Sequence, residues 1–135
     1  MRGSIGALVG VLLYAVAASA AEGVRPAGVY SNLHFNKQAG DLLGAEVIVF
    51  PSDSATGFSA LVQLAEGGAP SAFLVPVSVS GSRIEFLIPG PGAYAGLRFS
   101  GEVSRAGLVG RWNSGAAFGG AGDTERFKRG KSYWQ

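Results

Sequence analysis

The chain has 135 residues and a nearly balanced charge, with 11 basic and 9 acidic side chains and a formal net charge of +2 at pH 7. So weak a positive charge excludes a protein whose whole surface attracts nucleic acid. The sequence has no Cys and a single His, His34. Neither disulfides nor a zinc site built from Cys and His ligands is therefore predicted.

Residues 1–20 have the pattern of a signal peptide. Arg2 gives a short positive start, an apolar run over 5–16 follows, and Ala18-Ser19-Ala20 matches an A-x-A cleavage site. The apolar run is shorter than the roughly 20 residues that cross a bilayer. We expect cleavage after Ala20 and a periplasmic or secreted protein that does not span a membrane after cleavage. An uncleaved membrane anchor is the alternative.

Residues 21–135 predict one all-β domain. Short runs rich in Val, Ile, Leu and Phe are separated by turn sequences containing Gly, Pro, Asn or Asp, and no stretch has a sustained helical period. Most links are short enough for hairpins, so the strands should form an antiparallel up-and-down meander that becomes a small closed or partly open barrel. The eight expected strands cover 28–35, 41–50, 57–65, 71–80, 82–88, 96–104, 107–112 and 123–128.

Alternation within these strands separates a buried face from a wet face. In the strand over 82–88, Ile84 and Phe86 share one face, and Arg83 and Glu85 share the other. Each expected strand also carries at least one large aromatic residue, which either fills the core or lines a ligand pocket. These aromatic residues are Phe35, Phe50, Phe58, Phe73, Phe86, Phe99, Trp112 and Phe127.

The stretch "FSGEVSRAGLVGRW" is nearly symmetric about its turn. Folded as a hairpin, it places Phe99 opposite Trp112 and Gly101 opposite Gly110. Two facing glycines on an inward face leave a trough without side chains. The trough either allows close approach inside a coiled barrel or forms the floor of a ligand site between Phe99 and Trp112.

Pro76 interrupts the strand expected over 71–80. Proline has no N–H to donate to a strand ladder, so it is confined to bulges and unpaired edges. Its place in the middle of this run predicts a barrel that is open or split beside this strand.

The stretch "AGVYSN" resembles the opening strand of lipocalin- and avidin-like barrels. Gly28 and Tyr30 match the G-x-W-type start, and Asn32 falls where avidin-like barrels often place an inward polar residue. The whole chain is similar to small exported bacterial proteins of unknown function that share a G-x-Y start, a "GD-x-x-G" second strand (here residues 40–44) and a basic, aromatic end. The resemblance implies the barrel fold; it implies no particular ligand and no catalytic residue.

We expect a non-enzymatic binding protein that takes a small apolar or amphipathic ligand or a protein partner. The sequence shows no catalytic set, cofactor motif or metal site, and its carboxylates are scattered. A cell-envelope hydrolase that uses a pair of these carboxylates is the alternative. The candidate ligand-binding residues are Tyr30, Asn32, Phe99, Gly101, Gly110 and Trp112.

The last seven residues, 129–135, form a basic and aromatic tail. We expect the strand before it to pack Phe127 inward, and "SYWQ" to fold back over a barrel mouth or the seam near Pro76. The competing interpretation is an arm that docks onto a partner protein. The candidate partner-binding residues are Arg129, Lys131, Tyr133 and Trp134.

Overall fold

The computed structural model describes residues 23–113 and 123–135, so the predicted signal peptide and most of the Gly-rich link before the last strand lie outside the described residues. The described part is all-β and contains no helix, as predicted. Its ten strands are β1 (Gly28–Ser31), β2 (His34–Asn36), β3 (Asp41–Pro51), β4 (Phe58–Glu66), β5 (Ser71–Pro76), β6 (Ser78–Ser80), β7 (Arg83–Leu87), β8 (Arg98–Val103), β9 (Gly107–Trp112) and β10 (Glu125–Arg129).

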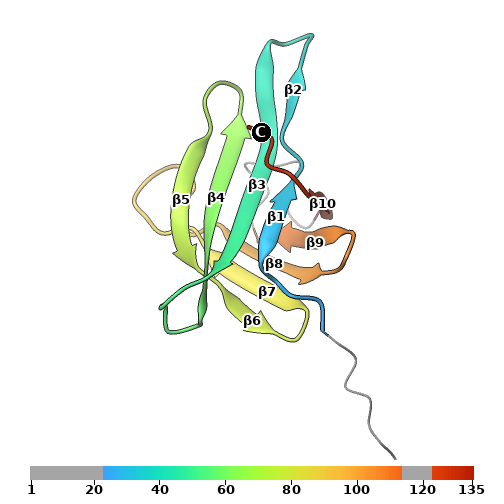
Figure 1. Cartoon of the computed structure of the whole chain (residues 1–135). Helices are drawn as coiled ribbons and strands as arrows, with labels where there is room; N and C mark the ends of the chain where they lie inside the picture. The colour runs from blue at the N-terminus through green and yellow to red at the C-terminus, as the bar shows by residue number, and fades with distance from the viewer. Residues whose placement is uncertain (1–22, 114–122) are drawn as a thin grey trace, which may run out of the picture.

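The strands form one antiparallel sheet that is rolled into a nearly closed barrel (Figure 1). The order is β5-β4-β3-β1-β10-β9-β8-β7-β6, with β2 attached to β3. The first and last strands of the chain pair with each other, Tyr30 lying opposite Arg129. The predicted antiparallel meander is therefore confirmed. The barrel has one unsealed seam, and the strands that flank it, β5 and β7, come from the middle of the sequence.

The first expected strand is broken at Asn32 and Leu33. The Asn32 Oδ1 accepts a hydrogen bond from the Ala45 N–H at 2.7 Å, and its Nδ2 donates to Glu125 Oε2 at 2.9 Å. The chain then continues as β2, which pairs only with the start of β3 and extends beyond the barrel (Figure 1). Phe35, on β2, is consequently 54% exposed, so its predicted place in the core is wrong.

Phe50 is also outside the core. Alternation along β3 turns Val47 and Val49 inward, where both are buried, and so turns Phe50 to the outer face. Phe58 and Phe73 are partly buried against the core. The remaining four aromatic residues named from the sequence face inward on their strands and are buried in the core. They are Phe86, Phe99, Trp112 and Phe127.

The strand expected over 71–80 is broken at Val77, directly after Pro76. Val77 N–H donates to Phe58 O at 2.9 Å, so the odd-numbered residues of β5 direct their backbone groups toward β4. The backbone groups of Ala72, Leu74 and Pro76 face the other edge. That edge is open, and the missing N–H of Pro76 costs no ladder bond there. The predicted split beside Pro76 is confirmed.

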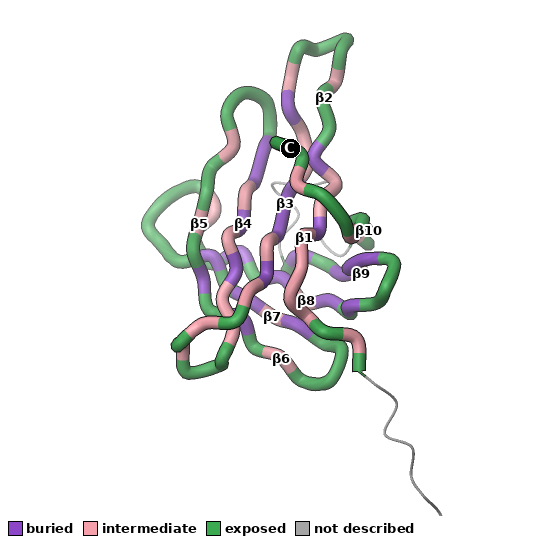
Figure 2. Tube along the Cα trace, in the orientation of Figure 1, coloured by how far each residue is buried: buried purple, intermediate pink, exposed green. Residues whose placement is uncertain are grey.

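Four aromatic rings form the centre of the core. The Phe99 ring centroid lies 4.9 Å from that of Trp112, 5.2 Å from that of Phe86 and 5.6 Å from that of Phe127. All four side chains are buried, and Figure 2 shows buried segments on the strands that enclose them. Stacked and edge-to-face pairs of this kind add to the stabilisation from apolar burial.

The glycine hairpin has the predicted register, with Gly101 opposite Gly110 and Phe99 opposite Trp112. A Cβ atom built on Gly110 would lie 2.4 Å from Phe99 Cζ and 2.4 Å from the Ser100 carbonyl oxygen. The Phe99 ring therefore fills the trough between the two glycines. Of the two interpretations of this trough, the close approach is the one that the contacts support.

Gly110→Ala is expected to destabilise the fold by about 3 kcal/mol, because the new methyl group overpacks a rigid ring and a backbone carbonyl. For a domain of this size the melting temperature should fall by about 10 °C or more. Gly23→Ala is the matched control, since no atom lies within 4 Å of a Cβ built at Gly23. Equal melting temperatures for the two variants would contradict the packing of Phe99 over Gly110.

Candidate functional site

Four of the predicted ligand-binding residues come together in the packed core. They are Phe99, Gly101, Gly110 and Trp112, and Phe99 occupies the space that a ligand would need over the glycines.

The other two predicted ligand-binding residues, Tyr30 and Asn32, are held by structural contacts. Tyr30 is 0% exposed and its hydroxyl donates to Pro26 O at 2.7 Å. Burial raises the pKa of the Tyr30 phenol, and the charge of Arg129 partly opposes this rise. Asn32 forms the bonds that break the first strand.

The C-terminal tail folds back, as predicted, and Glu46 holds it. Ser132 Oγ donates to Glu46 Oε1 at 2.6 Å, and the Tyr133 N–H donates to Glu46 Oε2 at 2.7 Å. Trp134 Nε1 donates to Gln63 Oε1 at 2.7 Å. These bonds place the tail on the outer wall over β3 and β4, so the predicted location at a barrel mouth or at the seam near Pro76 is wrong.

The location of the tail follows from the burial of Glu46. Glu46 is 0% exposed and is the one buried charged side chain among the described residues. A buried carboxylate needs hydrogen-bond donors, and the tail supplies two. The sequence does carry a signal for this site, since Glu46 is the one charged residue in the run 42–50. Tyr133 and Trp134 stay 40% and 53% exposed, so the tail covers Glu46 without burying its own rings.

Deleting residues 132–135 is expected to lower the free energy of unfolding by about 1–3 kcal/mol, because Glu46 loses both donors. Thermal unfolding followed by circular dichroism measures the change. Deletion of Gln135 alone is the control, since this residue makes no bond to Glu46. An unchanged melting temperature on removal of all four residues would show that the fold-back contributes nothing to stability.

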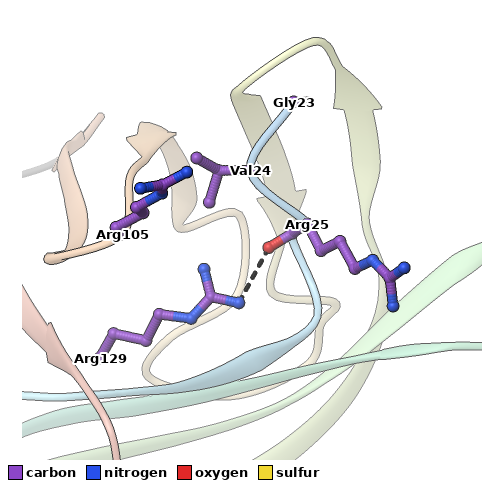
Figure 3. A pocket seen from close by; sticks show the side chains of 5 residues that line it. All are labelled: Gly23, Val24, Arg25, Arg105 and Arg129. Atoms are coloured by element: carbon purple, nitrogen blue, oxygen red, sulfur yellow. Dashed lines mark hydrogen bonds between the residues drawn. The ribbon is translucent and has the colours of Figure 1, made fainter. Parts of the chain in front are cut away.

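The sequence analysis placed Arg129 in the C-terminal tail. In the structure it ends β10 and lies at the end of the barrel where β1 begins. Its Nη2 donates to Arg25 O at 3.0 Å and to Ala27 O at 2.8 Å, and its guanidinium lies 5.4 Å from the centroid of the Tyr30 ring. Here a pocket of about 540 Å³, called the arginine pocket below, is lined by Gly23, Val24, Arg25, Arg105 and Arg129 (Figure 3). Of the four predicted partner-binding residues, Tyr133 and Trp134 contact each other, their ring centroids being 5.1 Å apart, Lys131 is exposed, and Arg129 lines the arginine pocket.

The seam between β5 and β7 is sealed at both ends. At one end β6 continues from β5 and pairs with β7, Ser78 lying opposite Glu85. At the other end Tyr94, in the loop between β7 and β8, makes an edge-to-face contact with Phe73, the ring centroids being 5.9 Å apart. The Tyr94 hydroxyl also donates to Glu66 Oε2 at 2.9 Å. Between these two closures the wall is open.

A cleft of about 330 Å³ occupies the open part of the seam. We call it the seam cleft; its lining combines apolar side chains with one acidic and one basic residue. Leu74 and Leu87, on its opposite sides, are 69% and 42% exposed. The sequence predicted the split at Pro76, but the residues across the seam could not be inferred from it. The lining residues are Thr56, Leu74, Val75, Pro76, Ser78, Glu85, Phe86, Leu87, Pro89 and Arg98.

The hydrolase alternative needs two carboxylates that converge, but each glutamate of the described chain has its own hydrogen-bond partner. Glu85 receives hydrogen bonds from Arg83 and Ser100, and these bonds lower the pKa of its carboxyl group. The described residues contain no group of three or more His, Cys, Asp or Glu side chains placed to hold a metal ion. The other pairs are Glu46 with Ser132, Glu66 with Tyr94, Glu102 with Ser82, and Glu125 with Asn32.

No family model matches this chain, and comparison with curated proteins and with solved structures gives no significant match. Within residues 23–113 and 123–135, no helix is long and apolar enough to cross a membrane.

Proposed function

We propose that the protein is an exported, non-enzymatic binding protein whose seam accepts an extended segment of a partner protein. The partner segment adds a strand to the open edge of β5 and places an apolar side chain in the seam cleft. The observation that carries this proposal is the unpaired, uncharged edge of β5 directly beside the seam cleft.

The open edge of β5 offers backbone groups to a new strand. Ala72 and Leu74 direct their N–H and C=O groups away from β4. Natural proteins protect such an edge with charged side chains or with proline; residues 71–80 contain no charge, and Pro76 blocks only the last position of β5. Strand addition takes its affinity from main-chain hydrogen bonds and its specificity from pockets for alternate side chains. The seam cleft, with Leu74 and Leu87 on its sides, is such a pocket.

The barrel interior gives less support to a ligand site than the seam does. Phe99 fills the trough over Gly101 and Gly110, and Tyr30 is fully buried with its hydroxyl bonded to Pro26. A barrel of about eight strands has room either for its own side chains or for one small ligand. Here the side chains take that room, so the binding role is assigned to the wall.

Export and a lipocalin- or avidin-like architecture are parts of the same proposal. The signal-peptide pattern of residues 1–20 and the G-x-Y start at Gly28 support them. Expression of the full reading frame, followed by fractionation and N-terminal sequencing, should give a protein that begins at Ala21 in the periplasm or the medium. Recovery of an uncleaved chain in membranes would contradict export by a cleaved signal.

Leu74→Lys should abolish capture of the partner, because a charge at the open edge opposes strand addition. The loss of affinity for the captured protein is expected to be about tenfold or more, as at an interface hot spot. Immobilised protein is incubated with cell-envelope proteins, and hydrogen exchange of the resulting complex is measured. Protection of the Ala72 and Leu74 amides is expected, since their N–H groups would bond to the partner strand.

Phe35→Lys is the matched control for Leu74→Lys. It makes the same kind of change at a residue that is 54% exposed and lies on β2, away from the seam. It should leave capture unchanged. Retention of a small apolar molecule in place of a protein, or unchanged exchange at Ala72 and Leu74, would contradict strand addition.

A further inference from the structure

The arginine pocket gathers side chains from three distant parts of the sequence. Arg25 precedes β1, Arg105 lies in the turn between β8 and β9, and Arg129 ends β10. Figure 3 shows the guanidinium groups of Arg105 and Arg129 directed toward the space beside Val24, whereas the Arg25 side chain points away from them. Arg105 and Arg129 therefore supply the charge of the pocket.

No carboxylate neutralises these two cations within the described chain. The one ion pair in residues 23–113 and 123–135 joins Arg83 to Glu85. Arg129 donates only to carbonyl oxygens, those of Arg25, Ala27 and Ser104, and Arg105 has no side-chain hydrogen bond in this part of the chain. Among the described residues these two positive groups share a pocket without a counter-charge, and such groups attract an anion.

Arg129 is fixed before any ligand arrives. Its guanidinium lies over the ring of Tyr30, which is itself bonded to Pro26. Gly28 leaves room for it, since a Cβ built there would lie 3.2 Å from Arg129 Nε. A side chain already held in place loses little conformational entropy on binding, so more of its interaction energy appears as affinity.

We infer that the arginine pocket binds a phosphoryl group. Its several negatively charged oxygens suit the paired N–H donors of Arg105 and the positive charge of Arg129, whose Nη1 and Nη2 already donate to carbonyl oxygens. The pocket of about 540 Å³ has room for a phosphoryl group that is part of a larger molecule. That molecule is either a soluble phosphate ester or a membrane phospholipid. The arginine pocket shares no lining residue with the seam cleft, so this inference stands apart from the proposed function.

The first test is a titration of the purified protein with inorganic phosphate. NMR spectra monitor the titration through the side-chain Nε–H signals of the arginines. The signals of Arg105 and Arg129 should move together. Arg105→Ala should weaken phosphate binding by about tenfold or more, because one charge-assisted donor pair is lost. It should keep the melting temperature of the parent, since Arg105 bonds to nothing in the described chain.

Arg111→Ala is the matched control, because Arg111 is an exposed arginine on β9 that does not line the arginine pocket. It should bind phosphate as the parent does. Equal weakening by Arg105→Ala and Arg111→Ala would overturn the inference, since the binding would then reflect overall charge.

Vesicles identify the source of the phosphoryl group. The parent and both variants are sedimented with two kinds of vesicle. One kind contains equal parts of phosphatidylcholine and phosphatidylglycerol, and the other contains phosphatidylcholine alone. Recruitment that depends on phosphatidylglycerol and on Arg105 supports the lipid source. Phosphate binding that depends on Arg105, without recruitment, supports a soluble ester. Absence of both phosphate binding and recruitment would overturn the inference.

Discussion

The missing N–H of Pro76 is the constraint on which the openness of this barrel depends. A strand that contains proline can join a neighbour on one side only at that position. β5 pairs with β4 through the residues on either side of Pro76, and its other edge therefore stays unpaired there. The chain then changes partner at Val77 and pairs with β7 as β6. Pro76 thus marks the end of the open edge of β5, and the Tyr94 contacts with Phe73 and Glu66 close the seam at its other end.

The core explains why the candidate sites lie on the wall and at the barrel end. A small barrel must fill its own centre, and here Phe99 does so by lying over two glycines, with Phe86, Trp112 and Phe127 around it. Such a centre is stable because apolar area is buried at high packing density. It also leaves no space over the glycine pair, so chemistry that involves other molecules is confined to places where strand pairing or the ends of strands leave gaps.

Local features of the sequence predicted the strands and the hairpin register well. The register of β8 and β9 was predictable because the inward face is specified by Phe99 opposite Trp112 and by the glycine pair, while Ser100 and Arg111 face each other on the outer face. The hydrogen-bond partners of Asn32, Glu46 and Arg129 were not predictable, because each lies far away along the chain. Asn32 bonds to Glu125 and Arg129 to Ala27. Glu46 accepts hydrogen bonds from Ser132 and Tyr133, at the far end of the chain. No spacing within a strand encodes such contacts.

The two arginines of the arginine pocket have different structural tasks, and this difference decides how an anion would be held. Arg129 closes the barrel, since its strand pairs with β1 and its side chain bonds the carbonyls of Arg25 and Ala27. A ligand that pulled Arg129 from these carbonyls would lose those bonds, so Arg129 can contribute its charge and its remaining donor capacity without moving. Arg105 has no such bonds to lose. The adjustable donors of the pocket therefore belong to Arg105, while Arg129 acts as a fixed positive wall.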